Sequence, residues 1–325
     1  MKILVTGGTG FIGQHLLPLL VKNPENQVFL LVRQPQKIDP DLQLQPALVP
    51  LPGDLFKIPP LPSDFDLVFH LAGLTKATRP TAYYSVNYSG TASLLKALNS
   101  QKKKIKFIYL SSLAAVGPAF NQIPVKEDDL PSPLNPYGRS KLLGERVALE
   151  YSSRFQVIII RVGAVYGPGD RDFLSFFRLI KKGLLLLFDS GRMKFNLCYV
   201  KDLIQALYLA ATQNLPSGEI FHIAAPRGYT WEEIGLTAAT ILKRKVLKIK
   251  LPSSLVFSVA FFSDLVSKIT GQASIINLDK YKEMKAAYWL ADPSKAQRRL
   301  GFKPEYDLKR GLNETIEWYL KAGWL

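Results

Sequence analysis

A short apolar run at the start of the chain meets a cluster of glycines, and a helix-like segment follows immediately. The apolar run is Lys2–Thr6, the glycines begin at Gly7, and the helical pattern continues to Val21. A strand, a tight turn and a helix in this order place the pyrophosphate of a nucleotide at the positive end of a helix dipole. We therefore predict a dinucleotide site lined by Gly7, Gly10, Phe11, Ile12 and Gly13.

The spacing of these glycines gives each of them a different physical task. They fit G-x-x-G-x-x-G from Gly7 and G-x-G-x-x-G from Gly8. Gly7 or Gly8 allows the sharp turn, Gly10 lets the backbone approach the phosphates, and Gly13 lets the helix pack closely on the strand. A glycine pattern alone is weak evidence, so the prediction depends on the residues that follow.

The length and the cysteine count limit the class of protein. A chain of 325 residues is long enough for one large α/β domain with a second lobe. The single cysteine, Cys198, excludes a disulfide framework, and no small-residue cleavage site closes the N-terminal apolar run. No apolar run reaches the roughly 18 residues of a membrane span. These features predict a cytoplasmic protein.

The net charge of +16 is spread along the chain in small clusters, such as Lys102–Lys104 and Lys243–Lys245. There is no basic groove with interleaved aromatic residues, so we expect solvated lysines rather than a nucleic-acid partner. The three histidines are widely separated and have no neighbouring ligand pattern, which argues against a metal site.

Strand-like runs alternate with helix-like segments through the first half of the chain. This pattern predicts an α/β protein with a Rossmann-type doubly wound parallel sheet, followed by a smaller, mostly helical C-terminal lobe that binds substrate. The expected strands are Lys2–Thr6, Gln27–Val32, Leu67–His70, Lys106–Ser111, Gln156–Val162 and Glu219–Ala224. The expected helices are Phe11–Val21, Tyr83–Ser100, Tyr137–Ser153, Phe173–Lys182, Asp202–Thr212, Trp231–Leu242, Pro252–Ile269, Pro293–Leu300 and Leu308–Lys321.

We divide the chain into a dinucleotide-binding domain, residues 1–165, and a substrate-binding lobe, residues 166–194 and 226–325. Residues 195–225 contain strand patterns that suit the sheet, so we expect them to return to it. The proline-rich stretch from Pro35 to Pro62 is expected to be loop with at most one short strand.

One segment of the second lobe, Leu255–Phe262, is unusually apolar and has lysines on both sides. This composition is compatible with contact to a membrane surface through residues 255–269. A buried helix explains it equally well, and we favour the buried helix.

The strongest chemical pair in the sequence is Tyr137 and Lys141. Four residues apart on a helix, the two side chains share one face. A lysine ammonium beside a phenol favours the phenolate and is expected to lower the phenol pKa from its usual value near 10. The pair then acts as a general acid and base toward a hydroxyl or carbonyl group. Ser112 lies at the end of an apolar strand, where its hydroxyl can bind the same substrate oxygen.

At this point the chain resembles the short-chain dehydrogenase/reductase superfamily, in its extended branch of epimerases, dehydratases and 3β-hydroxysteroid-dehydrogenase-like enzymes. The ordered motifs run from end to end. They are Thr6–Gly13, Gly53–Leu55, His70–Gly73, Asn87–Thr91, Ser111–Gly117, Tyr137–Lys141, Arg161–Gly169, Tyr199–Asp202 and Gly323–Leu325.

This resemblance implies a role for each matching residue. Ser112, Tyr137 and Lys141 take the catalytic roles. Asp54 and Leu55 match the adenine contact, Leu71, Ala72 and Gly73 match the strand end that lines the cofactor, and Asn87 matches a helix residue that orders the cofactor pocket. The family often forms dimers through the helices that carry Asn87 and Tyr137, so a homodimer is compatible with the sequence.

Two positions depart from the pattern of the nucleotide-sugar enzymes. Many of them have Asn where this chain has Ala164, and Arg near the position of Phe195. The catalytic segment also lacks the Asp-Glu pair of the dehydratases, since Leu113 and Ala114 stand there. These changes weaken the epimerase and dehydratase readings and favour a less polar substrate.

The end of the second expected strand bears on the choice of cofactor. An acidic residue there binds the ribose 2′-hydroxyl of NAD, but this chain has Arg33, and no carboxylate follows until Asp39. Arg33, with Lys37 as a second candidate, suits a 2′-phosphate, so NADP is preferred over NAD.

The leading hypothesis is thus an NAD(P)-dependent oxidoreductase that interconverts a secondary alcohol and a ketone on a small-molecule substrate. The alternative enzyme is a nucleotide-sugar epimerase or dehydratase. A third reading, a non-catalytic protein that keeps the cofactor fold, is disfavoured by the intact Ser112, Tyr137 and Lys141.

Overall fold

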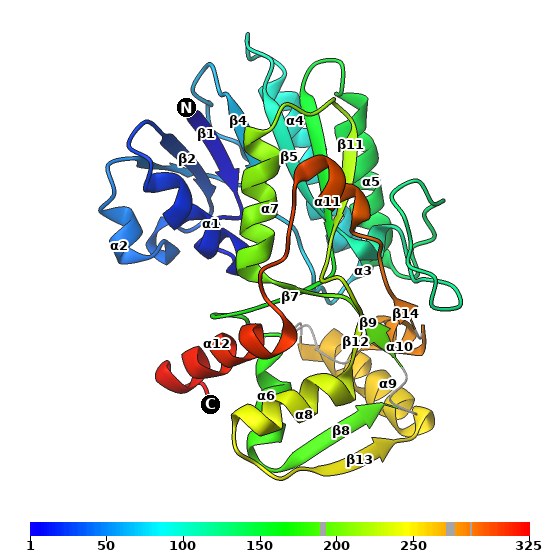
Figure 1. Ribbon diagram of the computed structural model, residues 1–325. Helices are drawn as coiled ribbons and strands as arrows, with labels where there is room; N and C mark the ends of the chain where they lie inside the picture. The colour runs from blue at the N-terminus through cyan, green and yellow to red at the C-terminus, as the bar shows by residue number, and fades with distance from the viewer. Residues whose placement is uncertain (189–192, 271–276, 287) are drawn as a thin grey trace.

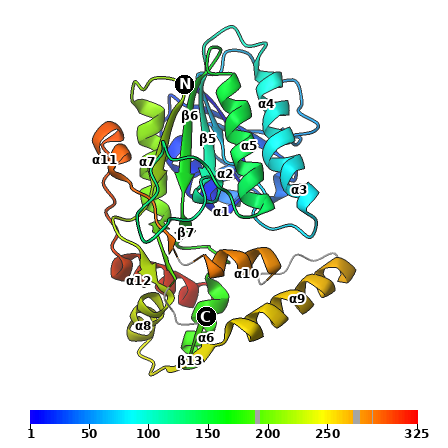
Figure 2. The same cartoon turned by 90° about the vertical axis from the view of Figure 1, so that its right-hand side faces the viewer.

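A seven-stranded parallel sheet with helices on both faces forms the upper part of the protein (Figures 1 and 2). The computed structural model describes residues 1–188, 193–270, 277–286 and 288–325. The strand order is β3-β2-β1-β4-β5-β6-β11. The strands are β1 (Lys2–Thr6), β2 (Gln27–Val32), β3 (Leu48–Pro52), β4 (Leu67–His70), β5 (Lys106–Ser112), β6 (Gln156–Val162) and β11 (Glu219–Ile223).

Two layers of helices cover this sheet and make two separate apolar cores. One layer contains α1 (Phe11–Val21), α2 (Pro40–Gln43), α7 (Val200–Thr212) and α11 (Ser294–Leu300), and the other contains α3 (Pro80–Tyr84), α4 (Thr91–Leu98) and α5 (Pro136–Glu150). Because the strands are buried on both faces, they are almost continuously apolar. The predicted Rossmann-type fold is confirmed.

Below the carboxyl ends of the strands lies a second lobe with its own apolar core (Figure 1). Its helices are α6 (Leu174–Lys181), α8 (Trp231–Ile241), α9 (Ser253–Thr270), α10 (Leu278–Lys285) and α12 (Leu308–Lys321). It also contains short strands, which are β7 (Ala164–Tyr166), β8 (Leu184–Phe188), β9 (Lys194–Phe195), β10 (Leu197–Tyr199), β12 (Tyr229–Thr230), β13 (Leu247–Leu251) and β14 (Tyr288–Trp289).

The parallel pair of β8 and β13 was not expected in a mostly helical lobe. Leu184 to Phe188 is a short apolar run, and Leu247 to Leu251 alternates apolar and basic residues, which is the period of a half-buried strand. Of residues 195–225, β11 pairs with β6 in the central sheet and α7 packs on that sheet, whereas β9 and β10 pair with other short strands.

The helix expected over Tyr83–Ser100 is divided. A π-helical segment, Ser85–Gly90, separates α3 from α4 and widens the helix at Asn87. Such widened turns occur frequently at functional sites.

The expectation of a buried helix over Pro252–Ile269 is wrong in one respect. The helix forms as α9, but it is not buried. Among the described side chains of α9, a narrow stripe that includes Val256 and Ala260 faces the lobe, while the large apolar side chains around it are between 45% and 63% exposed. These exposed residues are Leu255, Phe257, Val259, Phe261, Phe262, Leu265 and Val266. Within the described residues, no helix has the length and apolar character that crossing a bilayer requires.

A buried ion pair fixes α5 to the sheet. The Arg161 guanidinium on β6 donates from Nε and Nη2 to the two carboxylate oxygens of Glu145, at 2.9 and 2.7 Å. The Ser111 hydroxyl donates to the same carboxylate. Both charged side chains are at most 3% exposed, so each needs the other as a partner.

We expect Glu145→Ala to lower the free energy of unfolding by about 3–5 kcal/mol, because it leaves the Arg161 charge buried and unpaired. Denaturant unfolding followed by circular dichroism measures this loss. Glu150→Ala, at an exposed position of the same helix, is the matched control and should change stability by less than about 0.5 kcal/mol. Equal effects of the two substitutions would contradict the role assigned to the pair.

Candidate active site

The predicted site residues gather at the carboxyl ends of β1, β4 and β5. The strand order reverses between β1 and β4, since the chain moves outward to β2 and β3 and then returns to the other side of β1. Ligands of doubly wound sheets bind in the crevice at such a reversal.

The glycine loop between β1 and α1 has the geometry that the sequence predicted. Gly7 has a φ of +75°, and a Cβ there would lie 2.6 Å from the backbone nitrogen of Ala72. Gly7 is therefore the residue that makes the turn, and its carbonyl accepts a hydrogen bond from the Gly10 N–H at 3.0 Å. A Cβ on Gly13 would lie 2.4 Å from Gly8 Cα, so only glycine permits this helix-to-loop packing.

The N-terminus of α1 fits an anionic group. Gly10 is the N-cap residue, no side chain caps the helix, and its first turn carries no acidic residue. The first backbone N–H groups of α1 therefore remain available to phosphate oxygens. Phe11 and Ile12 begin this helix and are partly exposed.

Next to the loop, the ends of β2 and β3 carry opposite charges. Arg33 follows β2 and is exposed. The Asp54 carboxylate after β3 accepts hydrogen bonds from the backbone N–H groups of Lys57 and Phe56, at 2.7 and 2.8 Å. These bonds, with a smaller contribution from the Arg33 charge, lower the pKa of Asp54. Leu55 is buried, and a Cβ on Gly90 would lie 2.8 Å from its Cδ1.

The end of β4 is tied to its neighbours through backbone groups. The Leu71 N–H donates to the Thr6 carbonyl oxygen at 3.1 Å, and the Ala72 N–H donates to Thr6 Oγ1 at 3.3 Å. His70 lies fully buried between Thr6 Oγ1 and Thr91 Oγ1, at 2.7 and 2.9 Å, and burial lowers its pKa to about 3. His70 therefore holds the strand as a neutral side chain.

Asn87, Gly73 and Lys141 meet although they are distant in sequence. The Asn87 side chain accepts from the Leu74 N–H at 2.7 Å and donates to the Leu74 carbonyl at 3.0 Å and to Ser140 Oγ at 2.9 Å. Asn87 has no exposed surface, so it is not a helix-surface residue. A Cβ on Gly73 would lie 2.8 Å from Lys141 Nζ, so glycine makes room for the ammonium.

Lys141 is 4% exposed and points into the protein. Its Nζ donates to the Leu110 carbonyl oxygen at 2.8 Å and lies 5.1 Å from the ring centroid of Tyr109. Burial lowers the pKa of Lys141 to about 8, with the Glu145 charge acting in the opposite direction. The ammonium is thus easier to deprotonate than that of a lysine in water.

Tyr137 lies in the first turn of α5, beside Ser112 at the end of β5. Asn135 caps this helix by accepting from the Gly138 N–H at 2.9 Å. Burial raises the pKa of Tyr137 to about 12, and hydrogen bonding with Ser112 lowers it less than burial raises it. This differs from the expected lowering by Lys141, because the ammonium donates to Leu110 instead of the phenol. Tyr137 is therefore protonated near neutral pH and can act as a proton donor.

Two groups beside Tyr137, Tyr83 and Glu283, were not found from the sequence. The Tyr83 ring lies 5.9 Å from the Tyr137 ring, and its hydroxyl accepts from the Ala77 N–H at 3.0 Å. Glu283 on α10 accepts a hydrogen bond from Asn135 Nδ2 at 2.6 Å. Only the Asn135-Pro136 helix-start signature had a local signal, since α10 reaches the site through tertiary packing.

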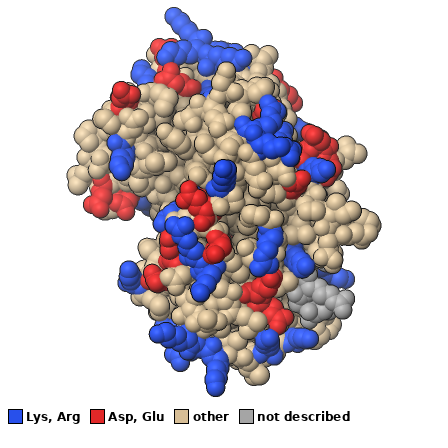
Figure 3. Space-filling view, viewed as in Figure 1, with Lys and Arg blue, Asp and Glu red and all other residues tan. Residues whose placement is uncertain are grey.

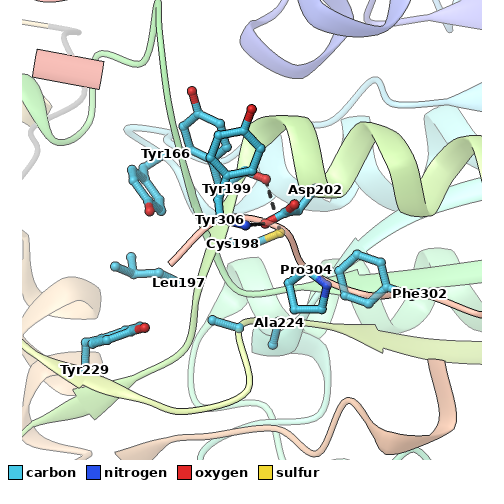
Figure 4. Close-up of a pocket in the computed structure, with 11 residues that line it drawn as sticks. Tyr166, Leu197, Cys198, Tyr199, Asp202, Ala224, Tyr229, Phe302, Pro304 and Tyr306 are labelled. Atoms are coloured by element: carbon cyan, nitrogen blue, oxygen red, sulfur yellow. Dashed lines mark hydrogen bonds between the residues drawn. The ribbon is translucent and has the colours of Figure 1, made fainter. Parts of the chain in front are cut away.

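A small pocket beside α7 lies apart from these residues (Figure 4). The Asp202 carboxylate at this pocket accepts from the backbone N–H groups of Glu305 and Tyr306, at 2.9 and 3.3 Å. The Tyr199–Asp202 motif therefore holds the C-terminal segment in place. The pocket is lined by Tyr166, Leu197, Cys198, Tyr199, Asp202, Ala224, Ala225, Tyr229, Phe302, Pro304 and Tyr306.

A Rossmann sheet with this glycine loop and with Ser112, Tyr137 and Lys141 at its carboxyl edge defines an enzyme of the short-chain dehydrogenase/reductase type. Residues 3–224 match the family described as NAD dependent epimerase/dehydratase. The chain belongs to this family.

Relatives and solved structures in the family differ in activity. The chain is 29% identical to a ceramide reductase of Caulobacter vibrioides over 99% of this chain and 96% of the relative. It is also 29% identical to a UDP-glucose 4-epimerase of Vibrio cholerae, with the same coverage. A crystal structure of UDP-glucuronic acid 4-epimerase from Bacillus cereus in complex with NAD has a TM-score of 0.79, 27% identity and 99% coverage of both chains. Sterol-4-alpha-carboxylate 3-dehydrogenases also match, as the steroid-dehydrogenase-like resemblance implied.

The lowered pKa of Lys141 gives a prediction about pH. Between pH 8 and the ordinary lysine value of 10.5, the unfolded chain binds more protons at this position than the folded chain does. The Lys141 contribution to the free energy of unfolding therefore rises with pH across this window.

NMR of lysine-labelled protein should show one lysine that titrates near pH 8, and Lys141→Met should remove that signal. Lys96→Met, at an exposed position of α4, is the control and should leave the signal unchanged. A titration of Lys141 near the value of a lysine in water would contradict the buried position of its ammonium.

Proposed function

We propose that the protein is an NADP-preferring oxidoreductase that interconverts a secondary alcohol and a ketone on a weakly polar substrate. The observation that carries this proposal is the position of Tyr137 and Ser112, beside a buried lysine at the strand edge where the glycine loop lies. Residues 1–165 serve the cofactor in this proposal, and residues 166–194 and 226–325 serve the substrate.

Several groups of this chain fit a nicotinamide dinucleotide. The N–H groups at the start of α1 hold the pyrophosphate, the end of β4 around Ala72 and Gly73 lines the crevice, and Lys141 holds the nicotinamide ribose. When bound, the cofactor supplies or accepts the hydride.

Ser112 and Tyr137 do the proton chemistry in this proposal. Ser112 Oγ accepts from the Ala114 N–H at 3.1 Å and is hydrogen-bonded with Tyr137, so a substrate oxygen that enters between the two hydroxyls would bind both. Tyr137 then donates its proton to that oxygen when a ketone is reduced, and takes it back in the reverse direction. The raised pKa of Tyr137 favours the donor role.

The substrate end of the site supports a weakly polar substrate. Phe195, near the position where many nucleotide-sugar enzymes have arginine, is 5% exposed, and its ring lies 4.9 Å from that of Trp231. A buried phenylalanine packed on a partly buried tryptophan offers no charge to a diphosphate. The similarity to a ceramide reductase agrees with this direction.

Arg33 supports the preference for NADP. Asp39, the first carboxylate after β2, accepts from the Asp41 N–H at 2.9 Å and caps α2, so Arg33 remains as the charged group at the end of β2. A guanidinium there suits the 2′-phosphate that distinguishes NADP from NAD.

We expect Arg33→Ala to raise the KM for NADPH about 10- to 100-fold and to change the KM for NADH by less than about threefold, because one charge-assisted hydrogen-bond partner is lost. Initial-rate kinetics with both cofactors measure this. Arg146→Ala, at an exposed position of α5, should leave both values unchanged. A wild-type enzyme that prefers NADH would overturn the cofactor assignment.

Epimerisation of a nucleotide sugar is the second candidate, favoured by the similarity to UDP-sugar epimerases. The two functions differ in their use of cofactor. A reductase consumes one NADPH for each ketone reduced, whereas an epimerase reduces and reoxidises its cofactor within one cycle. Incubation with NADPH and a panel of ketones, followed by absorbance, supports the reductase if absorbance falls. Interconversion of UDP-sugars without net oxidation supports the epimerase.

We expect Tyr137→Phe to reduce turnover by about 10² or more, because the variant keeps the ring and loses the proton donor. Stabilisation of the folded protein by NADPH in a thermal shift experiment should remain. Tyr208→Phe, at a 48% exposed tyrosine of α7, is the matched control and should keep full turnover. Full activity in the Tyr137 variant would remove this mechanism.

A further inference from the structure

The largest unexplained feature outside the site is the exposed apolar surface of α9. Leu255, Val259, Phe262 and Val266 follow one another at spacings of four, three and four, so they form one stripe along the helix. Phe257, Phe261 and Leu265 extend the apolar surface around the helix, and all of these side chains are exposed. A helix that is apolar nearly all round normally lies in a protein core or in lipid.

A strongly basic segment, residues 243–250, precedes this helix. Residues 243–251 read Lys-Arg-Lys-Val-Leu-Lys-Ile-Lys-Leu and contain no acidic residue. All five basic residues are exposed, and one of them, Lys248, pairs with Glu232 at 2.7 Å. β13, which holds Lys248 and Lys250, pairs with β8 at the end of the second lobe, where Figure 3 shows Lys and Arg side chains.

We propose that α9 and the basic segment 243–250 dock the protein on an anionic membrane surface, with α9 lying in the plane of the interface. Apolar burial and attraction to anionic lipids are the two signals that together give stable peripheral binding. The basic charge favours an anionic lipid surface over a second copy, because lipid headgroups would neutralise the five cations and a second copy would add five more.

The orientation of α9 agrees with contact to a flat surface. Figure 2 shows α9 running along the outer edge of the second lobe and away from its core. α10 packs on its inner side, where the Phe257 and Tyr281 rings lie 5.4 Å apart and Ser253 Oγ lies 3.0 Å from the Tyr281 hydroxyl. Phe257 is partly covered by this contact, whereas the stripe of Leu255, Val259, Phe262 and Val266 lies on a different face of the helix and is exposed.

Docking also places the candidate active site near the bilayer. α10 carries Glu283, which binds Asn135 at the start of the helix that holds Tyr137. Two contacts therefore connect α9 to the start of α5, which carries Tyr137. They are the contact of Phe257 with Tyr281 and the hydrogen bond of Glu283 with Asn135. This position suits the weakly polar substrate proposed above, although the docking itself does not depend on that proposal.

Vesicle sedimentation tests the docking. The purified full chain should sediment with vesicles of phosphatidylcholine and phosphatidylglycerol, and much less with vesicles of phosphatidylcholine alone. The triple variant Leu255→Ser, Phe262→Ser, Val266→Ser should weaken partitioning about 100-fold. The triple variant Lys243→Gln, Arg244→Gln, Lys245→Gln should weaken it about 100-fold at low salt and less at high salt.

Two matched controls carry the same chemical changes elsewhere. Leu44→Ser, Leu130→Ser, Leu320→Ser removes three exposed leucines, and Lys102→Gln, Lys103→Gln, Lys104→Gln removes three exposed lysines that precede β5, at the amino ends of the sheet strands. Both should bind vesicles like the unchanged chain. Thermal unfolding confirms that each variant folds.

Three outcomes overturn the proposal. The first is that the unchanged chain sediments with neither vesicle type. The second is that the triple Ser variant of α9 binds vesicles as well as the triple leucine control does. The third is that the chain forms a dimer that the triple Ser variant of α9 abolishes. Turnover of a water-soluble ketone by NADPH is measured separately. Vesicle binding without turnover supports the docking and contradicts the reductase proposal. Turnover without vesicle binding supports the reductase and contradicts the docking.

Discussion

The burial of one ammonium group is the constraint on which the candidate site depends. A charged lysine inside a protein is costly unless it is hydrogen-bonded, and Lys141 finds the Leu110 carbonyl and the face of Tyr109. Glycine at position 73 leaves room for this arrangement, because a Cβ there would lie 2.8 Å from the ammonium and would displace it. The arrangement also requires α5 to stay against the sheet, which the buried contact between Glu145 and Arg161 secures. The packing and the chemistry of the site are therefore inseparable.

The same burial sets the proton chemistry. It moves the pKa of the lysine down to about 8 and the pKa of the phenol up to about 12, so each group is pushed toward its neutral form. A pair of titratable groups whose pKa values are shifted by their environment is typical of acid–base sites. In the proposed mechanism the neutral phenol gives its proton to a carbonyl oxygen and takes it back in the reverse direction. The sequence suggested the opposite shift, because adjacency on a helix face does not say where the ammonium points.

Elements with a clear local signal could be predicted from the sequence. Phe11–Val21 and Leu308–Lys321 form the helices expected, and β1, β2, β4 and β6 have the expected bounds, because each combines an apolar period with a start or stop signal. The glycine loop followed from backbone sterics. The features that the sequence did not predict are determined by tertiary contacts. The π-helical turn at Asn87 depends on its bonds to Leu74, and the approach of Glu283 to Asn135 joins residues 148 positions apart. No local pattern encodes either contact.

The exposure of α9 shows the same limit and gives it a functional meaning. Composition cannot distinguish an apolar helix that fills a protein core from one that faces outward, because both kinds of helix are rich in the same apolar residues. The structure separates them, since the core of the second lobe is already filled by aromatic residues such as Phe177 and Tyr319. With its inner side closed, α9 has solvent on the rest of its surface, next to a run of exposed cations. An apolar surface beside positive charge matches the chemistry of an anionic bilayer. α10 then links that surface to the helix start at Asn135, so the proposed docking and the proposed chemistry share one structural unit.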